Sequence, residues 1–310
     1  MAQPALETHN LRKSFAGLPA VTGLDLTAPA GEIVGLVGPD GAGKTTTMRM
    51  LCGILSADAG EARVAGFDVQ RNPEAVKARI GYLPQRFSLH RDLTVQENVA
   101  YFADLYCVPR GTWEQRRDEL LEITYLSPFT RRLAGDLSGG MRQKLALVCT
   151  LIHRPEVILL DEPTTGVDPV SRRDFWRLLY DLPRQGVTVL VSTPYMDEAV
   201  RCNHLYFMFR GQALASGTPA QLREMVRHRI LEVRCHPQRE ARETLKAHPQ
   251  VVSVEVFGER LHVALRPEAE PEQVAVALRE HGVTCEGIRE VAPSLEDAFM
   301  ALAGGLLETG

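Results

Sequence analysis

The chain has 310 residues, of which 45% are hydrophobic and 24% charged, with a formal net charge of −4. This composition is ordinary for a globular protein, and it gives no sign of the basic face that nucleic-acid binding requires. The six cysteines are scattered without a CxxC pair, which argues against a zinc site or a disulfide framework and favours reduced thiols in a cytosolic protein.

The N-terminal stretch lacks the apolar core of a signal peptide. No apolar run reaches the roughly 18 residues that span a bilayer. We therefore expect that the chain does not enter a membrane by itself.

The first two thirds of the chain alternate β-type apolar runs with helical patterns. EIVGLVG (32–38), EVILLD (156–161) and VTVLVST (187–193) are predicted to be buried parallel strands, because near-continuous apolar runs are typical of sheets covered on both faces. A helix is predicted from Lys44 towards Leu51, with Gly53 as its C-terminal cap. The pattern therefore predicts an α/β fold.

Residues 92–134 are mostly helical in pattern and have their own amphipathic character. They are predicted to form most of a helical subdomain that covers about 86–150. Such an insert between two strands of the sheet would form a separate surface of the domain.

The pattern changes near SGTPAQL (216–222), where a second domain is expected to begin. The segments that follow have the order βαββαβ, which is the split-βαβ or ferredoxin-like order of a small α+β domain. A last amphipathic helix, PSLEDAFMALAG, places Leu295, Phe299 and Leu302 on one face. We predict domains at 1–218 and 219–310, and the dispersed histidines of the second domain suggest no catalytic site there.

GPDGAGKT, residues 38–45, matches the phosphate-binding pattern G-x-x-x-x-G-K-[ST] between a predicted strand and a predicted helix. Its glycines allow backbone N–H groups to surround phosphate oxygens, and the following helix adds its positive end. Lys44 is expected to contact the outer phosphates, and the Thr45 hydroxyl to ligate Mg²⁺. The alternative, a glycine-rich turn with an unrelated lysine, is disfavoured by the strand–helix context.

VILLDEP (157–163) ends a predicted buried strand with two carboxylates. Asp161 is placed to hold the Mg²⁺ hydration shell, and Glu162 to act as general base on the attacking water. The alternative is a solvated acidic pair at a strand end, and it loses weight beside a phosphate-binding loop. Ligands of open α/β sheets bind at this carboxyl edge.

LSGGMRQ (137–143) resembles the signature sequence of ABC-type ATPases, and it lies between the phosphate-binding loop and the Asp161 strand as in that family. Ser138, Gly139 and Gly140 open a predicted helix whose N–H groups form an anion site. Taken alone, Ser138 is also a preferred helix N-cap. The resemblance covers residues 6 to about 215 and is most similar to the ABC-2 branch of drug and polysaccharide exporters, which often carries a small C-terminal domain.

The resemblance implies roles for further residues. Phe15 matches the aromatic residue that stacks on adenine, although a core phenylalanine is the alternative. Gln85 matches the glutamine that reaches Mg²⁺, and Asp168 matches the key residue of the loop at the dimer interface. The full set implied to bind nucleotide is Phe15, Gly38, Pro39, Asp40, Gly41, Ala42, Gly43, Lys44, Thr45, Thr46, Gln85, Ser138, Gly139, Gly140, Gln143 and Asp168, with Thr45, Gln85 and Asp161 at the metal. Asp40 replaces the asparagine of many relatives, with little expected effect.

The family resemblance also implies a mechanism and partners. ATP, with Mg²⁺, would lie between the phosphate-binding loop of one subunit and the Ser138 segment of a second ABC ATPase, in a homodimer or a heterodimer. An integral membrane permease would supply the pathway, docked on residues of about 86–105, and would hold the chain at the cytoplasmic face of the membrane. No nucleic-acid partner is expected.

Pro194 departs from the family pattern, in which the strand ends on a histidine that contacts the γ-phosphate. Proline has no side-chain donor, so the site that contains it is expected to hydrolyse ATP slowly. Another donor would have to replace it, but His204 is ten residues further on, and Ser192 and Thr193 are poor substitutes. The alternatives to an exporter ATPase are a weakly catalytic regulatory subunit and a soluble ABC ATPase that acts without a transporter.

Overall fold

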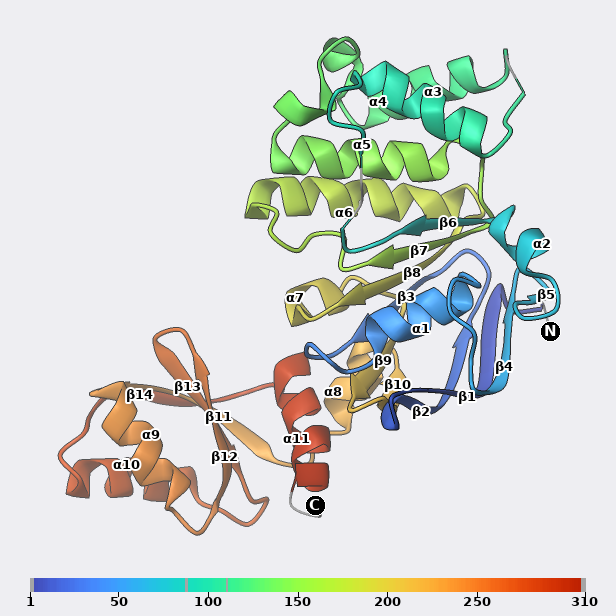
Figure 1. The fold of residues 1–310 in the computed structure, drawn as a ribbon. Helices are drawn as coiled ribbons and strands as arrows, with labels where there is room; N and C mark the ends of the chain where they lie inside the picture. Colours follow the sequence, from blue (N-terminus) through green and yellow to red (C-terminus); the bar gives the residue numbers. More distant parts are fainter. Residues whose placement is uncertain (1–2, 87–88, 110, 308–310) are drawn as a thin grey trace. The chain divides into compact units, whose positions relative to one another are not determined.

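The computed structural model describes residues 3–86, 89–109 and 111–307. The chain divides into two compact units, Met1–Ser216 and Gly217–Gly310, and each is described by itself. Figure 1 shows both units as a ribbon that is coloured along the sequence, from blue at the N-terminus to red at the C-terminus.

The first unit is built on a six-stranded sheet of order β10-β9-β3-β8-β7-β6. Strands β9, β3, β8, β7 and β6 pair in parallel, so their carboxyl ends meet at one edge. The predicted strands are present as β3 (Ile33–Val37), β7 (Val157–Asp161) and β8 (Thr188–Thr193), and all of their residues are buried. The remaining members are β6 (Ile80–Leu83), β9 (His204–Phe209) and β10 (Gln212–Gly217).

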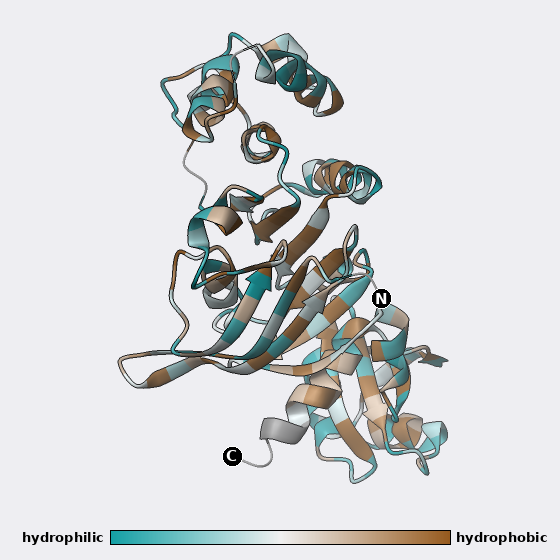
Figure 2. Cartoon of the chain, turned by 90° about the vertical axis from the view of Figure 1, so that its right-hand side faces the viewer, coloured by the Kyte–Doolittle hydropathy of each residue, from teal (hydrophilic) through white to brown (hydrophobic). Residues whose placement is uncertain are grey.

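Helices cover both faces of this sheet, as near-continuous apolar strands require. In Figure 1, α1 (Lys44–Leu51) and α6 (Pro169–Arg184) lie on opposite sides of it. Helix α1 has the predicted bounds, and Gly53 follows its C-cap at φ 66°, donating its N–H to the carbonyl of Met50. Figure 2 shows the resulting hydrophobic interior as brown strands and helix faces.

A second sheet of the first unit, of order β2-β1-β4-β5, was not predicted from the sequence. Its strands are antiparallel, and repeated register shifts interrupt the pairing of β1 with β2. Bulges of this kind break the alternation of buried and exposed residues by which a half-buried strand is recognised. The strands are β1 (Leu6–Phe15), β2 (Leu18–Ala28), β4 (Ala59–Val64) and β5 (Phe67–Asp68).

The predicted helical subdomain of about 86–150 contains α3 (Val95–Leu105), α4 (Trp113–Ile123) and nearly all of α5 (Gly139–Leu151). Thr94 begins α3 with a capping box that it shares with Glu97. The expected permease-docking segment 86–105 includes residues 87 and 88, which lie outside the described residues. Short elements complete the unit: α2 (Pro73–Lys77), η1 (Ser127–Phe129), η2 (Ala134–Asp136) and α7 (Met196–Ala199).

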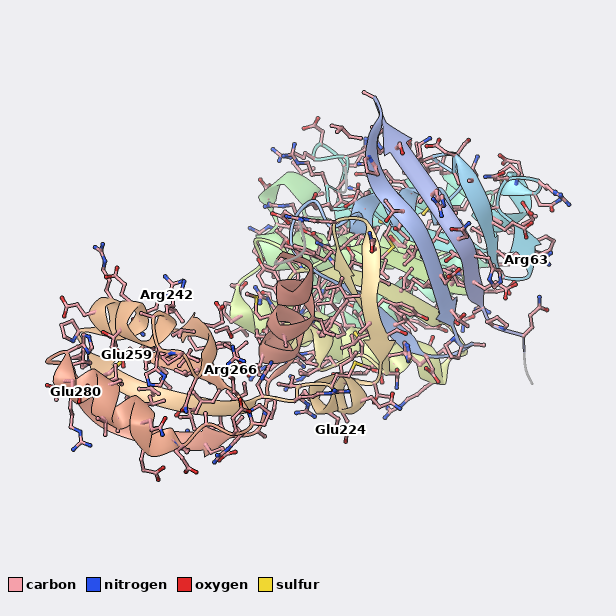
Figure 3. The ribbon with its side chains drawn as sticks, turned by 90° about the horizontal axis from the view of Figure 1, so that it is seen from below. Arg63, Glu224, Arg242, Glu259, Arg266 and Glu280 are labelled. Carbon is pink, nitrogen blue, oxygen red and sulfur yellow. The ribbon has the colours of Figure 1, made fainter. Side chains whose placement is uncertain are left out.

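The second unit has the predicted βαββαβ order, in a sheet β12-β13-β11-β14 whose described pairs are all antiparallel. This is the ferredoxin-like arrangement. Figure 3 shows charged side chains such as Arg242 and Glu280 on its surface. The elements are α8 (Pro219–Glu224), β11 (Arg229–His236), α9 (Gln238–Lys246), β12 (Val251–Phe257), β13 (Arg260–Leu265), α10 (Pro271–Glu280), β14 (Thr284–Val291) and α11 (Leu295–Leu307).

Among the residues that the structure describes, no helix is both long enough and apolar enough to cross a membrane.

Candidate nucleotide-binding site

The loop between β3 and α1 lies at the carboxyl edge of the parallel sheet and presents backbone N–H groups, among them those of Gly41 and Gly43, for which the described part of the chain provides no acceptor. Gly43 is the N-cap of α1 without a side-chain cap, so the first amides of the helix keep no side-chain partner there. Gly41 and Gly43 have φ of 78° and 99°, which residues with a Cβ rarely adopt. A Cβ on Gly43 would lie 2.5 Å from the carbonyl oxygen of Ala20. The loop therefore requires glycine for both its conformation and its packing, and it fits an anion.

Lys44 is the first residue of α1, and its ammonium lies inside the loop. Its Nζ donates to the carbonyl oxygens of Gly38 at 2.8 Å and Pro39 at 3.0 Å. It also forms an ion pair of 3.1 Å with Glu162 Oε1, in which the two side chains are 3% and 7% exposed. A nearly buried cation thus lies between the phosphate-binding loop and the end of β7.

Asp161 ends β7 and is almost fully buried beside α1 and β8. Its Oδ1 accepts hydrogen bonds from Thr45 Oγ1 at 3.1 Å and from Ser192 Oγ at 2.7 Å. Its Oδ2 lies 3.5 Å from the hydroxyl of Tyr82, whose pKa is raised by burial and by the negative charge of Asp161. Thr45 and Asp161 therefore bring two oxygen ligands of the kind Mg²⁺ prefers to one point.

Glu162 follows Asp161 in the left-handed region, with φ 49°. Its N–H donates to Ser192 Oγ at 2.9 Å and to the Ser192 carbonyl oxygen at 3.1 Å. Its side chain accepts from Gln85 Nε2 at 2.9 Å, in addition to the ion pair with Lys44. Glu162, the predicted base, thus contacts both Lys44 and Gln85, although the three residues come from separate segments of the sequence.

A cavity of about 490 Å³ lies over this group of residues. Phe15 contributes its ring to the wall and is 48% exposed, so it is not a core residue. The lining residues are Phe15, Ala20, Asp40, Gly41, Ala42, Gly43, Lys44, Thr45, Thr46, Gln85 and Glu162. An aromatic ring, a cation, free amides and Mg²⁺-type oxygen ligands fit a nucleoside triphosphate with its metal ion.

The Ser138 segment does not line this cavity. Ser138 is the N-cap of α5 and accepts from the N–H of Met141 at 3.2 Å, as the cap prediction requires. Gly139 and Gln143 line a different cavity of about 450 Å³, together with Gln85. Within one chain, the predicted nucleotide-binding residues that line a cavity therefore divide into two groups, and Gln85 lines both cavities.

Asp168 caps α6, and its Oδ1 accepts from the N–H groups of Val170 and Ser171. Hydrogen bonds from the side chain and the backbone of Ser171 lower the pKa of this carboxyl. Gly140 of α5 packs against the same turn, where an added Cβ would lie 2.3 Å from Ser171 Oγ. Gly140 thus permits the close approach of the Ser138 segment to the Asp168 loop.

Pro194 lies directly beside the phosphate-binding loop, because the carbonyl of Thr193 accepts from the N–H of Gly38 at 3.3 Å. Thr193 Oγ1 accepts from the N–H of Tyr195 and donates to buried Glu198. These bonds hold the segment on both sides of Pro194. His204 begins β9 opposite Val34, whereas the phosphate-binding loop follows Val37 at the other end of β3, so it is not placed to replace the missing donor.

Ser192, Tyr82 and Glu198 were not assigned to the site from the sequence. Ser192 carried a weak signal, since a hydroxyl in a buried apolar strand requires a partner. The partners themselves, Asp161 and the Glu162 backbone, lie about thirty residues away in sequence and could not be identified without the sheet register.

Each of the two units matches a family of known proteins. Residues 21–165 match the ABC transporter family model, and residues 217–303 match that of the DrrA1-3-like ATP-binding protein C-terminal domain. The chain is 44% identical over 310 residues to the probable multidrug ABC transporter ATP-binding protein YbhF of Escherichia coli, with 98% of this chain and 53% of the relative aligned. It thus spans about half the length of that relative.

Two other proteins match more of their own length. The Nod factor export ATP-binding protein I of Rhizobium sp. (strain N33) is 36% identical, with 99% of this chain and 100% of the relative covered. A solved ATP-binding subunit of an ABC transporter superposes with a TM-score of 0.65 at 26% identity, over 71% of this chain and 92% of the other. With its phosphate-binding loop, carboxylate pair and LSGGMRQ helix in this fold, the chain belongs to the family of ABC transporter ATP-binding proteins.

Proposed function

We propose that this chain binds and hydrolyses ATP to power an ABC-2 type membrane exporter. The observation that carries the proposal is the convergence of Lys44, Thr45 and Glu162 on one cavity at the carboxyl edge of the parallel sheet, with buried Asp161 hydrogen-bonded to Thr45. The proposed substrates of the exporter are drug-like, lipid-like or polysaccharide-like molecules, and the name of the multidrug relative supports the drug-like class. The proposed location is the cytoplasmic face of the membrane, through a permease.

In this proposal each residue acts through its chemistry. The backbone N–H groups of Gly41 and of residues 43–46, with the Lys44 ammonium, bind the phosphates, and the Phe15 ring stacks on the adenine. Thr45, Asp161 and Gln85 would hold Mg²⁺ directly or through its water ligands, and the bound ion would supply neutralisation of charge on the phosphate oxygens. Glu162 accepts a proton from the water that attacks the γ-phosphorus, so that ADP and inorganic phosphate are formed.

The division of the predicted residues into two groups supports a paired arrangement. Ser138, Gly139 and Gln143 lie outside the cavity of their own chain, so they are available to an ATP held by a second ABC ATPase. Asp168, at the start of α6, lies beside the Ser138 segment, since a Cβ on Gly140 would lie 3.9 Å from its Oδ2. We propose that two such cassettes join head to tail around ATP and separate after hydrolysis.

Pro194 favours a second candidate, a catalytically weak partner in an asymmetric pair. The segment at the end of β8 adjoins the phosphate-binding loop, yet position 194 offers no side-chain donor. The retained Glu162, Lys44 and Asp161 argue against a chain without any catalytic role. A soluble ABC ATPase that acts on nucleic acid or the ribosome would be expected to show a basic surface, which the net charge of −4 does not support.

The deciding experiment is purification of the full chain from membranes under mild detergent, followed by an ATPase assay of what co-purifies. An integral membrane protein in the complex, with MgATP hydrolysis abolished by Glu162→Gln, supports the exporter ATPase. A complex whose hydrolysis is unaffected by Glu162→Gln supports the regulatory candidate. Recovery with ribosomes or nucleic acid and no membrane protein would refute the transport proposal.

A further inference from the structure

Ser192 touches both carboxylate-bearing residues of the site. It is fully buried in β8 and pairs with Asp161 of β7 in the parallel register. Its Oγ lies 2.7 Å from Asp161 Oδ1 and 2.9 Å from the backbone nitrogen of Glu162. A single hydroxyl thus joins the proposed metal ligand to the backbone of the proposed base.

The hydrogen-bond roles at Ser192 are fixed by its partners. A serine hydroxyl has one proton to donate, and an ionised carboxylate can only accept. The proton therefore goes to Asp161, and a lone pair of Oγ accepts the N–H of Glu162. A bond of 2.7 Å to a carboxylate is in the range of strong, charge-assisted hydrogen bonds, so it restrains the rotation of Asp161.

The backbone of Glu162 needs this restraint. A non-glycine residue in the left-handed region, here with φ 49°, is held in that strained conformation by its surroundings. The Glu162 N–H has only the Oγ and the carbonyl oxygen of Ser192 as acceptors among its described bonds. Ser192 therefore sets both the orientation of Asp161 and the direction in which Glu162 leaves the strand.

We propose that Ser192 is a positioning residue of the ATPase site, which aligns Asp161 for Mg²⁺ and Glu162 for the attacking water. The inference rests on the proposed roles of these two carboxylates. Thr45, which also donates to Asp161 Oδ1, would then act together with Ser192 on the same oxygen, one from α1 and one from β8.

A matched control lies four residues earlier on the same strand. Thr188 is also buried, but its Oγ1 accepts from the N–H of Gly31, away from both carboxylates. Replacing either Ser192 or Thr188 by valine therefore removes a buried hydroxyl from β8. An effect on the nucleotide and metal site is expected only for Ser192.

The test compares Ser192→Val with Ser192→Thr, because valine and threonine have nearly the same volume and differ in the hydroxyl. Affinity for ATP is measured with Mg²⁺ and with EDTA, and single-turnover hydrolysis is followed across a Mg²⁺ titration. Loss of an outer hydrogen-bond partner typically costs about 10- to 100-fold in metal affinity or activity. We expect Ser192→Val to lower both the hydrolysis rate and the gain in ATP affinity that Mg²⁺ provides by that factor. The affinity for ATP measured in EDTA should be unchanged.

Ser192→Thr should restore both quantities, and Thr188→Val should leave them as in the parent protein. Equal behaviour of the valine and threonine variants, with parental Mg²⁺ dependence, would overturn the inference. If Ser192→Val does not fold, Ser192→Ala against Ser192→Thr makes the same comparison. Glu162→Gln is measured in parallel. If this variant still hydrolyses ATP, the proposed base is wrong. If it loses hydrolysis while Ser192→Val behaves as the parent protein, only the role of Ser192 is refuted.

Discussion

Replacing Pro194 by histidine tests the departure from the family pattern most directly. Thr193 binds Gly38 of the phosphate-binding loop through its carbonyl, and Ser192 binds the Glu162 N–H. Residue 194 therefore follows a segment whose backbone adjoins both the phosphate-binding loop and the proposed base. A histidine there has a ring N–H that a proline lacks.

The expected gain follows from the value of one donor aimed at developing charge. Removal of a preorganised donor of this kind costs an enzyme about 10²- to 10³-fold in rate. An introduced histidine has no supporting contacts selected for it, so we expect a smaller gain, about 10- to 100-fold. The fold should tolerate the change, because the Thr193–Tyr195 and Thr193–Glu198 hydrogen bonds do not involve the side chain at 194. The loss of proline rigidity should cost only about 0.4–1 kcal/mol of folding stability.

The assay is single-turnover hydrolysis of MgATP with protein in excess, which separates chemistry from product release. Pro194→Ala is the control, since it removes the ring without adding a donor, and it should hydrolyse ATP at the parental rate. An unchanged rate in Pro194→His, or an equal gain in Pro194→Ala, would refute the claim that a missing donor limits hydrolysis.

Three further predictions test the site and its surroundings. Glu162→Gln should abolish turnover and tighten ATP binding, because Lys44 is released from its ion pair; weaker binding in equilibrium titrations would contradict this. Gly140→Ala should lower the ATP-dependent pairing of two chains, measured by light scattering, since its Cβ would lie 2.3 Å from Ser171 Oγ. The control Gly139→Ala adds a Cβ that meets nothing within 4 Å and should have a milder effect. Equal effects of the two variants would speak against the contact. Burial lowers the pKa of His153, so the unfolded chain binds protons more readily and thermal stability should fall as pH drops below about 6.5. His153→Gln should flatten that dependence, and an unchanged slope would show that another group causes it.

The sequence alone determined the features that lie within short contiguous segments. Three of these segments are the phosphate-binding loop, the Asp161–Glu162 pair and the start of the LSGGMRQ helix. Each occupies a few consecutive residues, so the sequence shows both the backbone conformation and the chemical groups that the site requires. The βαββαβ order of the second unit was equally local, because its strands and helices alternate with regular turns. Pro194 was recognised for the same reason.

Only the tertiary structure decided which of these segments act together. The antiparallel sheet depends on bulged pairings of β1 with its neighbour β2 and with the more distant β4, and the bulges hide the local pattern of these strands. The separation of Ser138 from the cavity of its own chain, and the contact of Gly140 with Ser171, depend on how helices pack. The role proposed for Ser192 depends on the register of β7 with β8, which brings a serine beside a carboxylate 31 positions away. Such contacts follow from the packing of the whole domain, because strand ends far apart in sequence meet at one edge only after the parallel sheet has formed.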